Sequence, residues 1–113
     1  MRQYELAELK GTEKQIAWAE DIRKEFIEKF EEELGNEISK LKVYDRVHLS
    51  EQLEAKRQQT LANLAKAAEC FVRGIKKIDT AKFWIDAKVD GKIRVGTVSF
   101  NRLVTQIAKM GRV

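Results

Sequence analysis

Basic side chains at helical spacing in the second half of the chain are the residues best suited to a binding chemistry. Arg73, Lys76 and Lys77 lie three and four residues apart, so on a helix they share one face. Guanidinium and ammonium groups bind phosphate oxygens, which makes nucleic acid or another phosphate-rich ligand the expected partner. The predicted binding set comprises Arg73, Lys76, Lys77, Lys82, Lys88, Lys92, Arg94 and Arg102, with Lys109 as a further cation of this half.

The charge of the chain is unevenly distributed between its halves. Residues 1–54 hold 9 Lys and Arg against 14 Asp and Glu, and residues 55–113 hold 13 against 4. The halves therefore carry −5 and +9, which gives the net charge of +4 for the whole chain. This asymmetry favours an anionic partner for the second half. Acidic and basic faces that neutralise each other across a folded bundle or a dimer explain it equally well.

Signals of catalysis and of metal binding are weak. The sequence has no glycine-rich phosphate loop, no cluster of Cys and His, and no serine in a nucleophile-elbow context. The single histidine, His48, has no partner at metal-ligand spacing, and the single cysteine, Cys70, lies on an apolar helix face. The carboxylates of residues 31–33 point in different directions on a helix, as expected of a solvated helix end. We therefore expect a non-enzymatic protein without cofactor or metal.

The composition fits a single cytoplasmic domain. At 113 residues the chain has room for one domain with a modest core. It contains no apolar run long enough for a membrane span or a signal-peptide core. A lone cysteine forms no internal disulfide and fits a reducing compartment. We expect one domain over residues 1–113, in the cytoplasm and without membrane contact.

The elements that must hold the cations are predicted to be helices. Thr12 stands at an N-cap position, and Gln15 three residues later completes a capping box. Apolar residues then recur at three- and four-residue steps as far as Leu34, and Gly35 with Asn36 is the expected end of this first helix.

A second helical region is predicted to begin near Glu37. Residues 47–50 are its weak point, because Ser50 is a plausible new N-cap, so the region is either one helix or two. The strongest pattern is a long amphipathic helix over residues 51–78, with alanines where another helix can approach closely. We expect this helix to be the spine of the fold.

The last part of the chain is predicted to form two shorter helices. Asp79 or Thr80 caps the first, which is expected to stop near Lys88. A β-hairpin at Asp90 and Gly91 would place the apolar residues on opposite faces, so a helix cap fits better there.

An irregular or short extended stretch over residues 92–98 is expected next. Ser99 then caps a final helix that Gly111 ends. The whole pattern predicts an all-α or nearly all-α domain, a bundle of about four helices.

Two separated motifs resemble those of a known group of proteins. The first is LxGTxKQIxWAxxIR, over residues 9–23, and the second is AKFWID, over residues 81–86. Both resemble motifs of small, poorly characterised proteins carried by phages and other mobile elements, mainly of Gram-positive bacteria. Trp18 and Trp84 belong to one motif each. We expect Trp84 in the core rather than as a platform for base stacking, and packing of Trp18 on Trp84 is a hypothesis that would link the motifs.

The resemblance implies an accessory protein that acts in the bacterial cytoplasm. In that context we favour a non-enzymatic protein whose basic second half binds nucleic acid or another phosphate-rich ligand. The alternative is an inhibitor of a host defence protein complex, as anti-CRISPR proteins are, with the acidic first half imitating the charge of nucleic acid. A third possibility is a structural module that forms homo-oligomers such as a homodimer.

Overall fold

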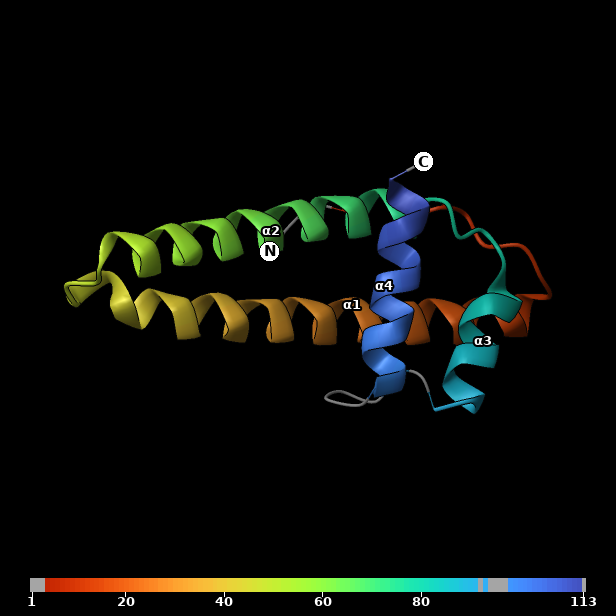
Figure 1. The fold of residues 1–113 in the computed structure, drawn as a ribbon. Helices are drawn as coiled ribbons and strands as arrows, with labels where there is room; N and C mark the ends of the chain where they lie inside the picture. Colours follow the sequence, from red (N-terminus) through yellow and green to blue (C-terminus); the bar gives the residue numbers. More distant parts are fainter. Residues whose placement is uncertain (1–3, 92, 94–97, 113) are drawn as a thin grey trace.

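Two long antiparallel helices form the frame of the protein in its computed structural model (Figure 1). Helix α1 (Glu13–Lys42) and helix α2 (Glu51–Ile75) are the arms of a hairpin, and the short 3-10 helix η1 (Val43–Arg46) lies in the turn between them. Helix α3 (Ala81–Val89) packs against α1, and helix α4 (Val98–Gly111) crosses the arms and packs mainly on α2.

The structure describes residues 4–91, 93 and 98–112. Within these ranges all regular elements are helical, which confirms the predicted all-α bundle of about four helices. No helix in the same ranges is both long and apolar enough to cross a membrane. Of the stretch predicted to be irregular or extended, residues 92–98, the structure describes Ile93 and Val98, and Val98 is the first residue of α4.

Two predicted helix starts are confirmed by their hydrogen bonds. The backbone N–H of Gln15 donates to Thr12 Oγ1 at 3.2 Å, and the backbone N–H of Thr12 donates to Gln15 Oε1 at 3.0 Å. Ser50 Oγ accepts from the backbone N–H of Leu53 at 3.3 Å and begins α2. The region after Glu37 is therefore interrupted before Ser50.

The predicted end of the first helix at Gly35 and Asn36 is wrong. Helix α1 continues to Lys42, so the region expected to begin near Glu37 is the last part of α1. Ile38 packs on the core from beyond Gly35. Burial of such apolar side chains outweighs the roughly 1 kcal/mol that a glycine costs inside a helix.

The predicted spine also needs correction. Helix α2 ends at Ile75, before residue 78, and its 25 residues are fewer than the 30 of α1. Helix α4 begins at Val98, one residue before the expected cap Ser99, and ends at Gly111 as predicted. Helix α3 stops at Val89, and Gly91 has a φ of 74°, as expected of a residue just after a helix end.

The N-terminal segment is tied to the body of the protein by its backbone. The N–H of Lys10 donates to the carbonyl of Asp79 at 2.8 Å, and the N–H of Ala81 donates to the carbonyl of Lys10 at 3.0 Å. Arg23 Nη1 donates to the carbonyl of Ala7 at 2.8 Å. Several positions of the first motif therefore serve the fold: its capping box starts α1, and its last residue, Arg23, holds the segment in front of it.

Aromatic rings fill the space between the arms where α4 crosses them. Phe71 stacks on Phe30 with ring centroids 3.8 Å apart, and Phe26 lies 5.8 Å from Phe71. Phe26 also contacts Phe100 of α4 at 5.2 Å and Trp84 of α3 at 5.6 Å. One cluster of rings thus joins all four α-helices.

The two tryptophans have different environments. Trp84 is fully buried, which confirms its predicted place in the core. Trp18 is 48% exposed and makes no ring contact with Trp84 among the described residues. The hypothesis that these two side chains pack on each other is therefore wrong, because Phe26 and Phe83 surround the Trp84 ring instead.

Glycine allows α4 to lie almost backbone to backbone on α2. A Cβ atom at Gly74 of α2 would overlap the carbonyl group of Ile107 in α4. A Cβ atom at Gly111 of α4 would overlap the carbonyl group of Cys70 in α2. These glycines fix where α4 crosses α2, and hence which of its faces points away from the bundle.

Candidate nucleic-acid interface

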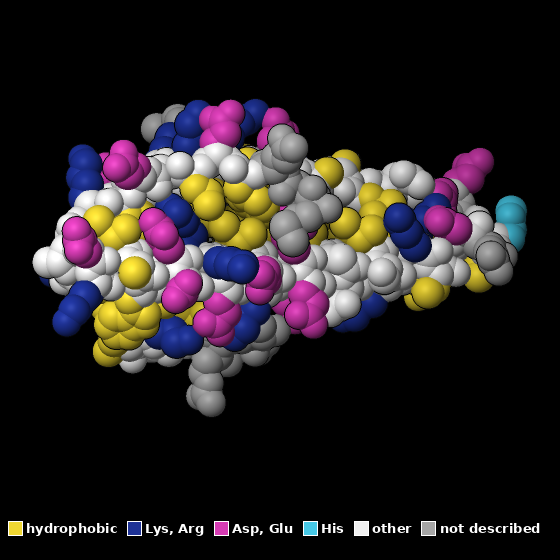
Figure 2. All heavy atoms as spheres, turned by 180° about the vertical axis from the view of Figure 1, so that it is seen from behind, with side chains coloured by type: hydrophobic (Ala, Val, Ile, Leu, Met, Phe, Trp, Pro, Cys, Tyr) yellow, Lys and Arg dark blue, Asp and Glu magenta, His cyan; other side chains and the backbone are white. Residues whose placement is uncertain are grey.

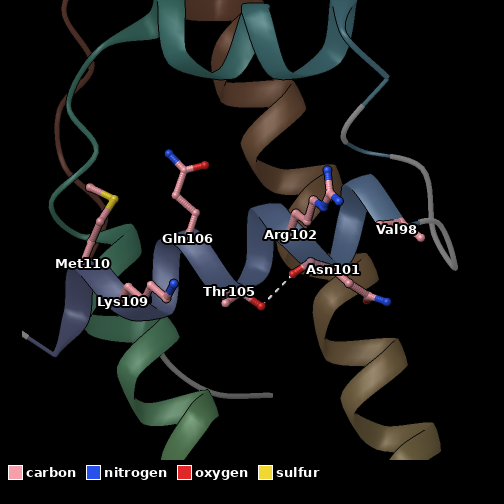
Figure 3. A pocket seen from close by; sticks show the side chains of 7 residues that line it. All are labelled: Val98, Asn101, Arg102, Thr105, Gln106, Lys109 and Met110. Carbon is pink, nitrogen blue, oxygen red and sulfur yellow. Dashed lines mark hydrogen bonds between the residues drawn. The ribbon is translucent and has the colours of Figure 1, made fainter.

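Helix α4 has one face in the core and one in solvent. Phe100, Leu103 and Ile107 are buried against the rest of the bundle. On the other side, polar residues recur at three- and four-residue steps and form a shallow surface (Figure 3). This α4 outer face consists of Val98, Asn101, Arg102, Thr105, Gln106, Lys109 and Met110.

The residue types of the α4 outer face suit nucleic acid. Arg102 and Lys109 supply positive charge, and α4 contains neither Asp nor Glu. Arginine, asparagine and glutamine are also the side chains that hydrogen-bond most readily to base edges, and Asn101 and Gln106 flank these cations. Thr105 is already engaged, since its hydroxyl donates to the carbonyl of Asn101 at 2.9 Å.

The shape of this face suits an extended ligand rather than a small molecule. Figure 3 shows the side chains spread along α4 without converging on one point. Arg102 and Lys109 are seven residues apart, which corresponds to about 10 Å along a helix axis. Both side chains are exposed, and neither forms an ion pair within the described part of the chain.

The other predicted cations lie elsewhere and most are engaged. Arg73 pairs with Glu69 one turn earlier on α2. Lys77 Nζ donates to the carbonyl of Met110 at 2.7 Å, so its charge lies at the C-terminal end of α4, where a cation is favoured. Neither side chain is among those that line the α4 outer face.

Lys76 and Lys88 connect the basic half of the chain to its acidic half. Lys76 pairs with Glu5, and its hydrogen bond lowers the pKa of the Glu5 carboxyl. Lys88 pairs with Glu25 at 3.0 Å, and the pKa of Glu25 is lowered by hydrogen bonds from Lys88 and from Lys29. Part of the charge asymmetry is therefore neutralised by folding, as the second interpretation of the sequence proposed.

The remaining members of the predicted set divide into three cases. Lys82 is exposed on α3 and forms no ion pair with another described residue. Lys92 and Arg94 lie outside the described residues. Among the described members of the predicted set, Arg102 alone lines the α4 outer face, where it lies with Lys109.

Asn101 and Gln106 were missed by the sequence analysis, although a signal for them exists. They share with Arg102 the face of α4 opposite Leu103 and Ile107, and this face follows directly from helical periodicity. Counting cations alone passes over neutral side chains, which can hydrogen-bond to base edges as well.

The surface behind α4 has a different character. Figure 2, which views the molecule from behind, shows acidic side chains along α1 with cations among them, and hydrophobic surface between the arms. Among the described residues no group of His, Cys, Asp and Glu is arranged to hold a metal ion.

Comparisons with known protein families, with curated proteins and with solved structures found no match to this chain.

Proposed function

We propose that this chain is a non-enzymatic accessory protein of a phage or mobile element that binds nucleic acid through the α4 outer face. The observation that carries the proposal is the pair of cations Arg102 and Lys109, exposed beside Asn101 and Gln106 on a helix without acidic residues. Basic side chains that are not paired within the protein can neutralise phosphates of a nucleic acid. The counterions condensed on those phosphates are then released, and their release drives binding.

The position of α4 supports the same proposal. It lies across the hairpin as an outer layer, so its polar face can approach a ligand without rearrangement of the core (Figure 1). The major groove of B-DNA, about 12 Å wide, admits an α-helix. In that arrangement Arg102 and Lys109 bind phosphates or guanine edges, and Asn101 and Gln106 bind base edges.

The test is a salt titration of binding to short duplexes and single strands of DNA and RNA by fluorescence anisotropy. The variant Arg102→Glu/Lys109→Glu should bind at least about 10-fold more weakly at low salt. The slope of log affinity against log salt concentration should correspond to about two fewer phosphate contacts. The matched control is Lys14→Glu/Lys24→Glu, which changes the net charge equally at two exposed positions of α1. It should lose much less affinity, because those side chains are not part of the α4 outer face.

Two results would contradict the proposal. One is the absence of any binding by the unmodified protein at about 50 mM salt, where phosphate contacts are strongest. The other is an equal loss of affinity in the two charge-reversal variants, which would mean that net charge alone governs binding. Asn101→Ala and Gln106→Ala keep the charge, so a change in sequence preference in these variants would indicate contacts with base edges.

The alternative, an inhibitor of a host defence protein, depends on the acidic face of α1. Glu28 and Glu32 are exposed, whereas Glu31 accepts a hydrogen bond from the Tyr4 hydroxyl at 2.6 Å. Glu28→Gln/Glu32→Gln should leave nucleic-acid binding intact if α4 is the binding element. The alternative would be favoured if the unmodified protein and Arg102→Glu inhibit a defence complex and Glu28→Gln/Glu32→Gln does not.

A further inference from the structure

The far end of the α1–α2 hairpin projects beyond the rest of the protein (Figure 1). This hairpin tip, residues 37–60, consists of the last turns of α1, η1 and the first turns of α2. The molecule measures 56 × 26 × 22 Å, with a radius of gyration of 16.3 Å. A compact chain of this length would have about 13 Å. Among the described residues, no further helix covers the tip.

The hairpin tip exposes large apolar side chains. Val43, Tyr44, Val47 and Leu53 are each between 45% and 66% exposed. A shallow groove beside them is lined by Leu41, Leu49 and Leu53 together with polar side chains. Exposed apolar side chains that gather on one part of a small protein indicate a contact surface, whereas isolated ones need no explanation.

The charges of the hairpin tip are nearly balanced, and several of them are paired with one another. Residues 37–60 hold 5 Lys and Arg against 4 Asp and Glu. Arg57 bridges Asp45 at 2.5 Å and Glu54 at 2.7 Å, and Lys40 pairs with Glu37 at 3.2 Å. Such a surface offers little to a strongly charged partner. It does meet the requirement for self-association, because identical surfaces that face each other across a two-fold axis must not repel.

We propose that two copies of this chain associate through their hairpin tips. The two arms of one tip pack against the two arms of the other, with Val43, Val47 and Leu53 at the centre of the contact. This arrangement completes a four-helix layer that one hairpin leaves half-built. The α4 outer faces lie away from the contact, so the dimer carries two nucleic-acid-binding faces and gains affinity for ligands long enough to reach both.

The oligomeric state in solution tests this inference. Light scattering over about 5 μM to about 500 μM, a range suited to small interfaces, should show the mass rising from that of one chain toward that of two. Val47→Glu/Leu53→Glu should remain a monomer throughout. Leu6→Glu/Val89→Glu introduces the same charges at exposed apolar positions outside the tip and should dimerise normally. Circular dichroism verifies that both variants keep their helices.

A disulfide provides a second readout. Val47→Cys should form covalent dimers on mild oxidation, and Val89→Cys should not. The native Cys70 is buried and does not compete.

A mass of one chain at the highest concentration, or a dimer that the tip variant leaves intact, would overturn the inference. Val47→Glu/Leu53→Glu should bind a duplex too short for two copies as well as the unmodified protein does. Dimerisation and nucleic-acid binding are therefore tested independently of each other.

Discussion

The crossing, where α4 lies over the two arms, and the hairpin tip are built from the same two helices and differ in what covers them. At the crossing, rings from all four α-helices contact one another, and Gly74 lets two backbones meet. At the tip, the ion pair of Arg57 with Asp45 ties α2 to η1, and apolar side chains remain exposed. The two regions therefore differ because α4 covers the crossing, which stabilises the fold, and leaves the tip exposed to make other contacts.

Truncation of a core ring should measure this difference most strongly. Phe71 is fully buried and contacts the rings of Tyr4, Phe26 and Phe30, so Phe71→Ala should lower the free energy of unfolding by about 3–5 kcal/mol. Leu53→Ala at the tip should cost less than about 1 kcal/mol. Chemical denaturation at low protein concentration compares the two without a contribution from self-association. Equal losses would mean that the tip is as well packed as the crossing.

Glycine substitutions should sharpen the comparison through the sign of their effects. Gly74→Ala pushes a methyl group against the carbonyl of Ile107 and should destabilise the protein by about 2–3 kcal/mol. Gly35→Ala adds the same group in the middle of α1, where nothing lies within 4 Å, and should stabilise it by about 0.5–1 kcal/mol. Thermal unfolding of both variants would decide this, and a stabilising Gly74→Ala would mean that α4 does not approach α2 so closely.

Gly35 and Gly74 also show what the sequence could and could not predict. Two local signals were reliable, since the capping box of Thr12 and Gln15 and the cap at Ser50 both follow from hydrogen bonds within one turn. Gly35 was misread as a helix end, because packing on the other arm overrides propensity. The need for glycine at position 74 depends on a neighbour that is distant in the sequence.

The candidate site was predictable to the same extent. Arg102 was identified from its charge, and the face of α4 follows from its periodicity. The pairing of Lys76 with Glu5 and of Lys88 with Glu25 was not predictable, because each pair joins residues from opposite halves of the chain. Sequence gives the number of cations, but the fold decides which of them remain available to a ligand.

Acid should affect the hairpin tip through Glu54, and this is the smallest of the expected effects. Hydrogen bonds from Arg57, and then from Gln58, lower the pKa of Glu54 to about 2. Because the folded protein holds this pKa below the ordinary value of a glutamate, the contribution of Glu54 to stability is complete above about pH 5. It is lost as the pH falls toward 2, where the carboxyl becomes protonated in the folded state as well.

Denaturation of the unmodified protein and of Glu54→Gln between pH 2 and 7 would measure this contribution. The difference in the free energy of unfolding should be constant near neutrality and should shrink to a small remainder as the pH falls to 2. As the pH falls, NMR of the same samples should show amide shifts that change first around Arg57 and last around Phe71. The reason is that ion pairs hold Arg57 at the tip, whereas buried rings join the arms at the crossing. If the difference between the unmodified protein and Glu54→Gln persists unchanged to pH 2, Glu54 stabilises the tip by packing and not by its charge. The tip would then be held together by packing, as the crossing is.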